Sequence, residues 1–192
     1  MCIRATPASL LFPNGLKRGA DGLIYVPSSI SDGIRVMEPQ TNGKLTEIAT
    51  IKLGMPADNL AVDATGDIYA AGLPKLLDIV HSMDDPFGIE APSTIWRISK
   101  TSSGYETKKV LEDRDKEILS GVTTARHDAK TGRLFVGGGF SRISLSWALF
   151  RAPFPAAISF RSLLMSSRCA DPIHNGLRSK VNKSHSEATS SL

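Results

Sequence analysis

Two stretches of the sequence indicate the fold most directly: Phe12-Pro13-Asn14-Gly15-Leu16 and Ala57-Asp58-Asn59-Leu60-Ala61-Val62-Asp63. A tight turn and a short β-type run follow each at nearly the same distance, Asp21-Gly22-Leu23-Ile24-Tyr25 in the first case and Gly66-Asp67-Ile68-Tyr69 in the second. Each stretch therefore places short oxygen-bearing side chains just before a predicted strand. Oxygen ligands at equivalent places in repeated β units can converge on one hard cation, and Ca²⁺ takes about six to eight of them.

The same unit of acid, turn, glycine, apolar residue and aromatic residue occurs three times. The closing aromatic residues are Tyr25, Tyr69 and Phe135, at intervals of 44 and 66 residues. The first interval is close to the roughly 40–50 residues of a four-stranded propeller blade. The second interval requires an insertion, and Leu73–Pro92, with its several prolines, is expected to supply one as an irregular loop.

Short runs with β-type composition lie between these units, and the Asn42-Gly43 step is a strong hairpin signal. The expected strands are Leu23–Pro27, Gly33–Glu38, Lys44–Lys52, Ile68–Ala71, Thr94–Ser99 and Lys108–Leu111. Helical periodicity is weak, and Glu112–Leu119 is the best helical candidate. The sequence predicts an all-β fold in which residues 1–138 form about three blades of a β-propeller.

Residues 139–192 have a different composition. They contain 12 serines and 7 Lys and Arg against 2 Asp and Glu, whereas residues 1–138 contain 16 Lys and Arg against 17 Asp and Glu. Such a polar segment buries too little apolar surface to offset the entropy of ordering. We expect a Ser/Arg-rich tail, largely disordered, and separate from the β region. The net charge of +4 comes from this tail, which has no recognition motif, so no nucleic-acid partner is expected.

Other features exclude further classes. The two cysteines, Cys2 and Cys169, form neither a disulfide framework nor a zinc site. No apolar run reaches the roughly 18 residues that a membrane span needs. Arg4 and Pro7 interrupt the N-terminal apolar segment, which makes it a poor secretory signal. The sequence therefore assigns no cellular compartment.

The candidate ligands are Asn14, Asp58 and Asn59. Each has an ordinary structural alternative, since Asn-Gly is a common turn dipeptide and Asp-Asn suits a turn before a strand. Their matched positions in consecutive repeats are more specific than either motif alone. One carboxylate and two amide oxygens also suit calcium. The acids of the repeat itself, Asp63, Asp67 and Asp128, are expected to close turns.

The two motifs, together with Gly66-Asp67-Ile68-Tyr69, resemble the second half of the serum paraoxonase/arylesterase family, within the gluconolactonase-like group of calcium-dependent six-bladed β-propellers. The resemblance covers about residues 11–138. It implies that Asn14, Asp58 and Asn59 bind a catalytic Ca²⁺ at the floor of the central channel. It also implies that Asp58 is a candidate general base.

The resemblance implies hydrolysis of aryl esters, lactones or phosphotriesters. In such a reaction calcium polarises the carbonyl or phosphoryl oxygen and stabilises the developing oxyanion. A carboxylate or histidine then activates water. The implied partners are calcium and a small-molecule ester or lactone.

Three departures from the family pattern limit this expectation. Three ligands are fewer than the roughly six that calcium needs. The position where the family often has a histidine is occupied by Leu73, which cannot act as an acid or base. Three blades are half of a six-bladed ring. We therefore expect a truncated chain that is inactive alone, and a gene model lacking its upstream exons is one explanation.

Two other interpretations remain open. A non-catalytic β-propeller-type binding module is the first, because propellers also serve as interaction surfaces. A structural remnant that misfolds is the second. Calcium binding that is lost on substitution of Asp58 or Asn59 would favour the hydrolase, folding without a metal response would favour the module, and aggregation would favour the remnant.

Overall fold

The computed structural model describes residues 4–6, 9–85, 88–117 and 119–138. All of them belong to the first of two compact units, residues 1–159. The predicted disordered tail and both cysteines lie outside the described residues, and the predicted boundary at residue 138 stays a prediction.

The described residues form nine strands and one helix, and the predicted all-β fold is confirmed. The elements are β1 (Lys17–Arg18), β2 (Ile24–Pro27), β3 (Asp32–Pro39), β4 (Leu45–Val62), β5 (Ile68–Gly72), α1 (Leu76–Asp84), β6 (Ser93–Thr101), β7 (Gly104–Asp113), β8 (Val122–Asp128) and β9 (Arg133–Gly138). Every strand pair is antiparallel and joins neighbours in the sequence. This up-and-down order is the arrangement of propeller blades.

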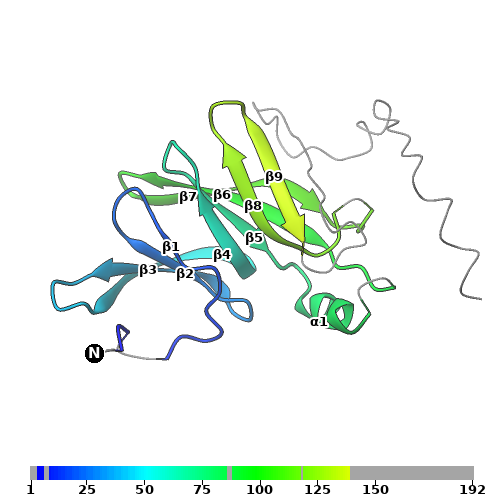
Figure 1. The fold of residues 1–192 in the computed structure, drawn as a ribbon, viewed down its shortest axis with the longest axis horizontal. Helices are drawn as coiled ribbons and strands as arrows, with labels where there is room; N and C mark the ends of the chain where they lie inside the picture. Colours follow the sequence, from blue (N-terminus) through cyan, green and yellow to red (C-terminus); the bar gives the residue numbers. More distant parts are fainter. Residues whose placement is uncertain (1–3, 7–8, 86–87, 118, 139–192) are drawn as a thin grey trace, which may run out of the picture. The chain divides into compact units, whose positions relative to one another are not determined.

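Strand β4 belongs to two sheets (Figure 1). Its first part closes the four-stranded sheet β1–β4, and its last part opens a second four-stranded sheet with β5, β6 and β7. The strand turns between them at Gly54, whose φ of +76° favours glycine. The carboxylate of Asp32 accepts hydrogen bonds from the N–H groups of Leu53 and Gly54, at 3.0 and 2.9 Å, and fixes the turn. Strands β8 and β9 form a third, two-stranded sheet within the described residues.

The predicted repeat matches three hairpins, β1–β2, β4–β5 and β8–β9. Gly22, Gly66 and Gly132 stand at the three turns with φ between +66° and +88°. The carboxylates of Asp63 and Asp128 each accept main-chain N–H bonds within their own turns, as expected.

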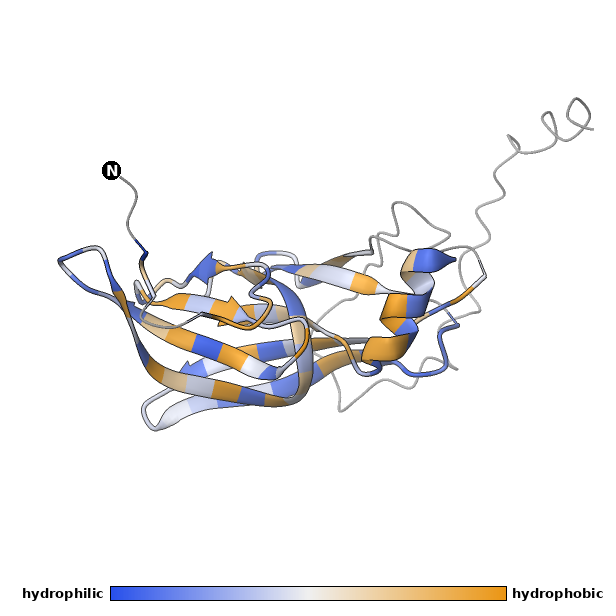
Figure 2. Ribbon diagram, turned by 90° about the horizontal axis from the view of Figure 1, so that it is seen from below, coloured by the Kyte–Doolittle hydropathy of each residue, from blue (hydrophilic) through white to orange (hydrophobic). Residues whose placement is uncertain are grey.

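The main core lies between the first and second sheets. Apolar residues alternate with polar ones along several strands (Figure 2), as half-buried strands require, whereas the five residues of β5 are all buried. The buried cluster comprises Tyr25, Ile34, Val36, Ile51, Leu53, Ala57, Leu60, Ile68, Ala70 and Ile98. The Tyr25 hydroxyl extends the contact, 3.1 Å from that of Tyr105 in β7. These contacts hold β4 and its polar residues in place.

Two local predictions were wrong. The segment Leu73–Pro92 is not wholly irregular, because it contains α1, whose Ile79 packs in a buried cluster with Leu73 and Ala91. The described residues of the segment Glu112–Leu119 are not helical: β7 runs to Asp113, whose carboxylate accepts the N–H groups of Glu117 and Leu119 and folds the chain back. Among the residues that the structure describes, no helix is long and apolar enough to span a membrane.

Candidate functional site

Asn14 and Asp58 are in contact, although 44 residues separate them. The Asn14 Nδ2 atom donates a hydrogen bond to Asp58 Oδ1 and a second one, of 3.1 Å, to the hydroxyl of Ser29. A main-chain bond of 3.2 Å from the Asn14 N–H to the Pro27 carbonyl holds the loop against β2. The loop that precedes the first sheet therefore meets the strand that opens the second.

Gly15 allows this approach. Its φ is +62°, and a Cβ atom built on it would lie 2.5 Å from Asn59 Cα and 3.0 Å from Asn59 Oδ1. No side chain fits at the first distance, so the glycine of the Asn-Gly step brings the Asn14 loop directly onto Asn59. The amide oxygen of Asn59 faces this loop.

Asp58 and Asn59 lie in a β-bulge. Ala57 pairs with Gly72 and Leu60 pairs with Ala70, so two residues of β4 stand opposite one of β5. Consecutive residues in a regular strand point to opposite faces. The extra residue re-aims the side chains, and both Asp58 and Asn59 contact the Asn14 loop.

The third sheet also reaches this site. Asn59 Nδ2 donates a 2.9 Å hydrogen bond to the main-chain carbonyl of Thr123, at the start of β8, and lies 3.3 Å from Asp58 Oδ1. Sequence analysis missed this contact and that of Ser29. A main-chain carbonyl has no signature in the sequence, and a lone serine after a predicted strand gives no signal.

Burial dominates the electrostatics of Asp58. It raises the pKa of this half-buried carboxyl above its usual range. No Lys, Arg or His side chain of the described residues forms an ion pair with it. A buried carboxylate is costly without a compensating positive charge, and two amide N–H groups are its partners here. The Asp58 carboxylate suits a cation, which the Asn14 amide oxygen could also bind after rotation of its side chain.

The set of three is incomplete for calcium. The described residues contain no group of three or more His, Cys, Asp or Glu side chains that could hold a metal. Asn14, Asp58 and Asn59 offer one carboxylate and two amides, fewer than the roughly six to eight oxygens calcium takes. Leu73 is buried, with its N–H bonded to the Pro56 carbonyl at 2.9 Å, and it adds no titratable group.

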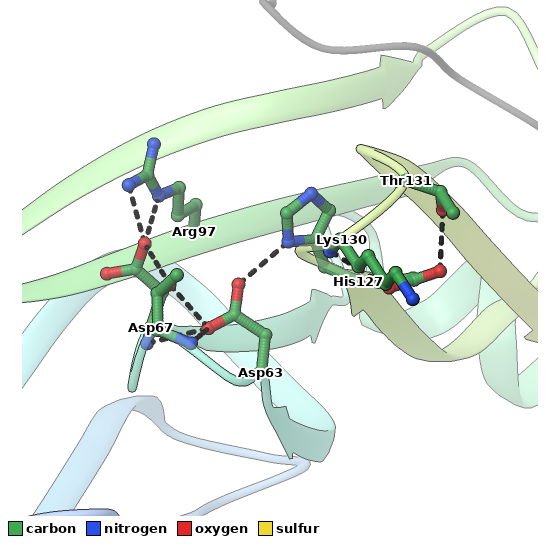
Figure 3. Close-up of polar contacts among 8 residues, drawn as sticks. Asp63, Asp67, Arg97, His127, Lys130 and Thr131 are labelled. Carbon is green, nitrogen blue, oxygen red and sulfur yellow. Dashed lines mark hydrogen bonds and ion pairs between the residues drawn. The ribbon is translucent and has the colours of Figure 1, made fainter.

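A second polar cluster lies at the other end of the same part of β4 (Figure 3). His127 Nδ1 lies 2.7 Å from Asp63 Oδ2, and the imidazole stacks on Tyr69 with ring centroids 4.8 Å apart. Arg97 binds the neighbouring Asp67 carboxylate at 2.5 and 2.7 Å. About five extended residues, or roughly 16 Å, separate Asp58 from Asp63, so this cluster is distinct from the Asn14–Asp58 site.

The chain is all-β and of the propeller type. It has two up-and-down antiparallel sheets, a third sheet of two strands, and an oxygen-rich site on β4, the first strand of the second sheet. The comparison with protein families agrees: residues 2–145, well over half of the chain, match the arylesterase family model. The chain belongs to the arylesterase family, which confirms the resemblance noted from the sequence.

Two curated relatives support this assignment. The chain is 28% identical over 142 residues to serum paraoxonase/arylesterase 2 of Gallus gallus, covering 73% of this chain and 39% of that protein. It is 27% identical over 124 residues to serum paraoxonase/arylesterase 2 of Homo sapiens, covering 64% of this chain and 33% of that protein. The chain therefore spans well under half the length of these relatives.

Proposed function

We propose that this chain provides part of the calcium site of an arylesterase-type hydrolase acting on esters, lactones or phosphotriesters. Family membership supports hydrolase chemistry in general. The observation that supports the site most strongly is the contact between Asn14 and Asp58, because it joins two repeats at a half-buried carboxylate that has no basic partner among the described residues.

The proposed ligands are Asn14, Asp58 and Asn59, each through a side-chain oxygen. Calcium bound there would supply Lewis-acid polarisation of the substrate oxygen. The chain's own residues do the rest: Asn14 and Asn59 orient the Asp58 carboxylate through their amides. Asp58 is the proposed general base, since a carboxyl whose pKa is raised by burial is better suited to accept a proton near neutral pH.

Three ligands are too few for a complete calcium shell. We therefore propose that the chain alone binds calcium weakly and does not hydrolyse esters measurably. The relatives are more than twice as long as the stretch that matches, and their additional length has room for the missing oxygens.

Calcium titration of the purified full chain, followed by calorimetry and thermal melting, tests this proposal. We expect calcium to raise the melting temperature of the unmodified chain, and Asp58→Ala or Asn59→Ala to abolish the rise. Asp84→Ala is the matched control, because Asp84 is an exposed carboxylate at the end of α1. Equal calcium responses in Asp58→Ala and Asp84→Ala would disprove the site.

The non-catalytic binding module remains the second candidate. Helix α1 exposes Leu77 and Met83, at 71% and 52%, and large apolar side chains of this kind form the exposed patches at which proteins bind partners. A chain that melts cooperatively at a temperature that calcium does not change would favour this candidate.

A further inference from the structure

The three hairpins place three residues at one position of the repeat. Asn14, Asp58 and Thr123 each stand five residues before the residue that opens their turn, which is Gly19, Asp63 and Asp128 respectively. The first two of the three are in contact with each other. The repeat therefore predicts that Thr123 also faces the site, and the hydrogen bond from Asn59 to its carbonyl agrees.

A second bulge makes the Thr123 carbonyl accessible. Val122 pairs with Gly138 and Thr124 pairs with Gly137, so Thr123 is an extra residue without a partner in β9. A bulge leaves the extra residue outside the regular ladder. The 2.9 Å bond from Asn59 Nδ2 is directed at the carbonyl of this unpaired residue.

This bond fixes the orientation of the Asn59 amide, whose nitrogen is held by the Thr123 carbonyl and also lies 3.3 Å from Asp58 Oδ1. Only the nitrogen end can donate to a carbonyl, so the oxygen end must point the other way. Asn59 Oδ1 indeed faces Gly15, the neighbour of Asn14. Without the bond the side chain could rotate and present a donor where a cation needs an acceptor.

The geometry points to Thr123 as a positioning residue: its main-chain carbonyl, freed by the β8 bulge, holds the Asn59 amide nitrogen and so leaves the amide oxygen facing Gly15, beside Asn14. The expected consequence of this positioning is tighter calcium binding, and that consequence rests on the proposed function. The positioning itself is a property of the metal-free chain. The third sheet would then contribute to the site by positioning Asn59.

The β9 glycines provide a matched pair of variants. A Cβ on Gly138 would lie 2.8 Å from the Gly121 carbonyl oxygen, so Gly138→Ala pushes on the main chain two residues before Thr123. A Cβ on Gly137 would meet only the Thr124 methyl group, at 3.2 Å. Thr123→Val keeps the carbonyl and removes the hydroxyl, and so isolates any role of the side chain.

The first readout is hydrogen exchange of side-chain amides, measured by NMR on the metal-free full chain. In the unmodified chain the Asn59 NH₂ group should exchange at least tenfold more slowly than that of Asn42, whose side chain lies in an exposed turn and uses its oxygen rather than its nitrogen. Gly138→Ala should speed Asn59 exchange at least tenfold, while Gly137→Ala and Thr123→Val stay within twofold. Equal exchange of Asn59 and Asn42 in the unmodified chain would overturn the positioning role even if no variant folds.

The second readout is calcium affinity, expected to fall about tenfold in Gly138→Ala and less than twofold in the two controls. A chain that shows the exchange pattern but no calcium binding would refute the proposed function and keep the positioning. Normal calcium binding with equal exchange rates in Gly138→Ala and Gly137→Ala would refute the positioning role of Thr123 and keep the proposed function. A tenfold loss of calcium affinity in Thr123→Val alone would show that the Thr123 hydroxyl has the positioning role, and would refute the role proposed for the carbonyl.

Discussion

His127 Nδ1 lies 2.7 Å from Asp63 Oδ2, and this contact joins the third sheet to the second. Both side chains are buried, with 11% and 1% exposed. The other Asp63 oxygen accepts the main-chain N–H groups of Thr65 and Asp67 and the Thr65 hydroxyl. One carboxylate therefore closes a turn and connects two sheets, at the end of β4 away from Asn14 and Asp58.

Removal of the Asp63 carboxylate should destabilise the chain strongly. Asp63→Ala leaves two main-chain N–H groups and one imidazole nitrogen without their acceptor, and we expect a loss of about 3 kcal/mol in the free energy of unfolding. Urea denaturation followed by tryptophan fluorescence measures it. The control is Asp84→Ala, which should change stability by less than about 0.5 kcal/mol. A loss no larger than the control would show that the contact contributes nothing.

The Asp63 carboxylate should also make the stability of the folded chain depend on pH in the acidic range. Burial opposes ionisation of Asp63, but hydrogen bonds from His127 and the turn outweigh it and hold the pKa of the carboxyl below its usual range. A lowered folded-state pKa gives stability that is present above the unfolded value of about 3.9 and is lost as pH falls through the folded value. The stability difference between the unmodified chain and Asp63→Asn should therefore shrink below about pH 4. Urea titrations at pH 7, 5, 4 and 3 test this, and a constant difference would contradict it.

The repeat made most of the fold predictable. Turn glycines such as Gly22 and Gly66 fixed where strands begin, and equal spacing from those turns placed Asn14 and Asp58 on neighbouring sheets. The helix was missed because Pro74 and Pro86 mark loops when considered alone. They flank α1 rather than interrupt it, and proline is compatible with the residues just outside a helix.

The finer geometry of the site was not accessible from the sequence. Nothing in the residue types shows that Asp58 and Asn59 lie in a bulge, because a bulge depends on the register with β5. The Thr123 carbonyl belongs to the main chain, and every residue has one. Nothing in the sequence links His127 to Asp63, because 64 residues separate them and only the packing of two sheets brings them together.

Gly15 should be less tolerant of substitution than Gly22, another glycine with positive φ. Gly15→Ala incurs both the cost of a left-handed backbone, about 1–2 kcal/mol, and a clash with Asn59 Cα. Gly22 has φ +82°, and a Cβ added to it would meet no atom nearer than 3.8 Å, so Gly22→Ala isolates the backbone cost. We expect Gly15→Ala to lose at least about 1 kcal/mol more in unfolding free energy and to weaken calcium binding, with Gly22→Ala leaving affinity unchanged. Equal losses in the two variants would show that the Asn14 loop moves freely away from Asn59.

Tyr69 should make the chain sensitive to alkali. Burial raises the pKa of its phenol to about 12, helped by the nearby carboxylates and opposed by Arg97. The unfolded chain releases this proton near pH 10, so between about pH 10 and 12 the folded state binds more protons and stability falls as pH rises. Tyr69→Phe removes the titrating hydroxyl while keeping a ring to stack on His127, and should flatten this decline. Urea denaturation at pH 8, 9.5 and 10.5 measures the slope, with absorbance at alkaline pH reporting the tyrosine ionisation. An identical slope in Tyr69→Phe and the unmodified chain would mean that the Tyr69 phenol titrates normally in the folded state.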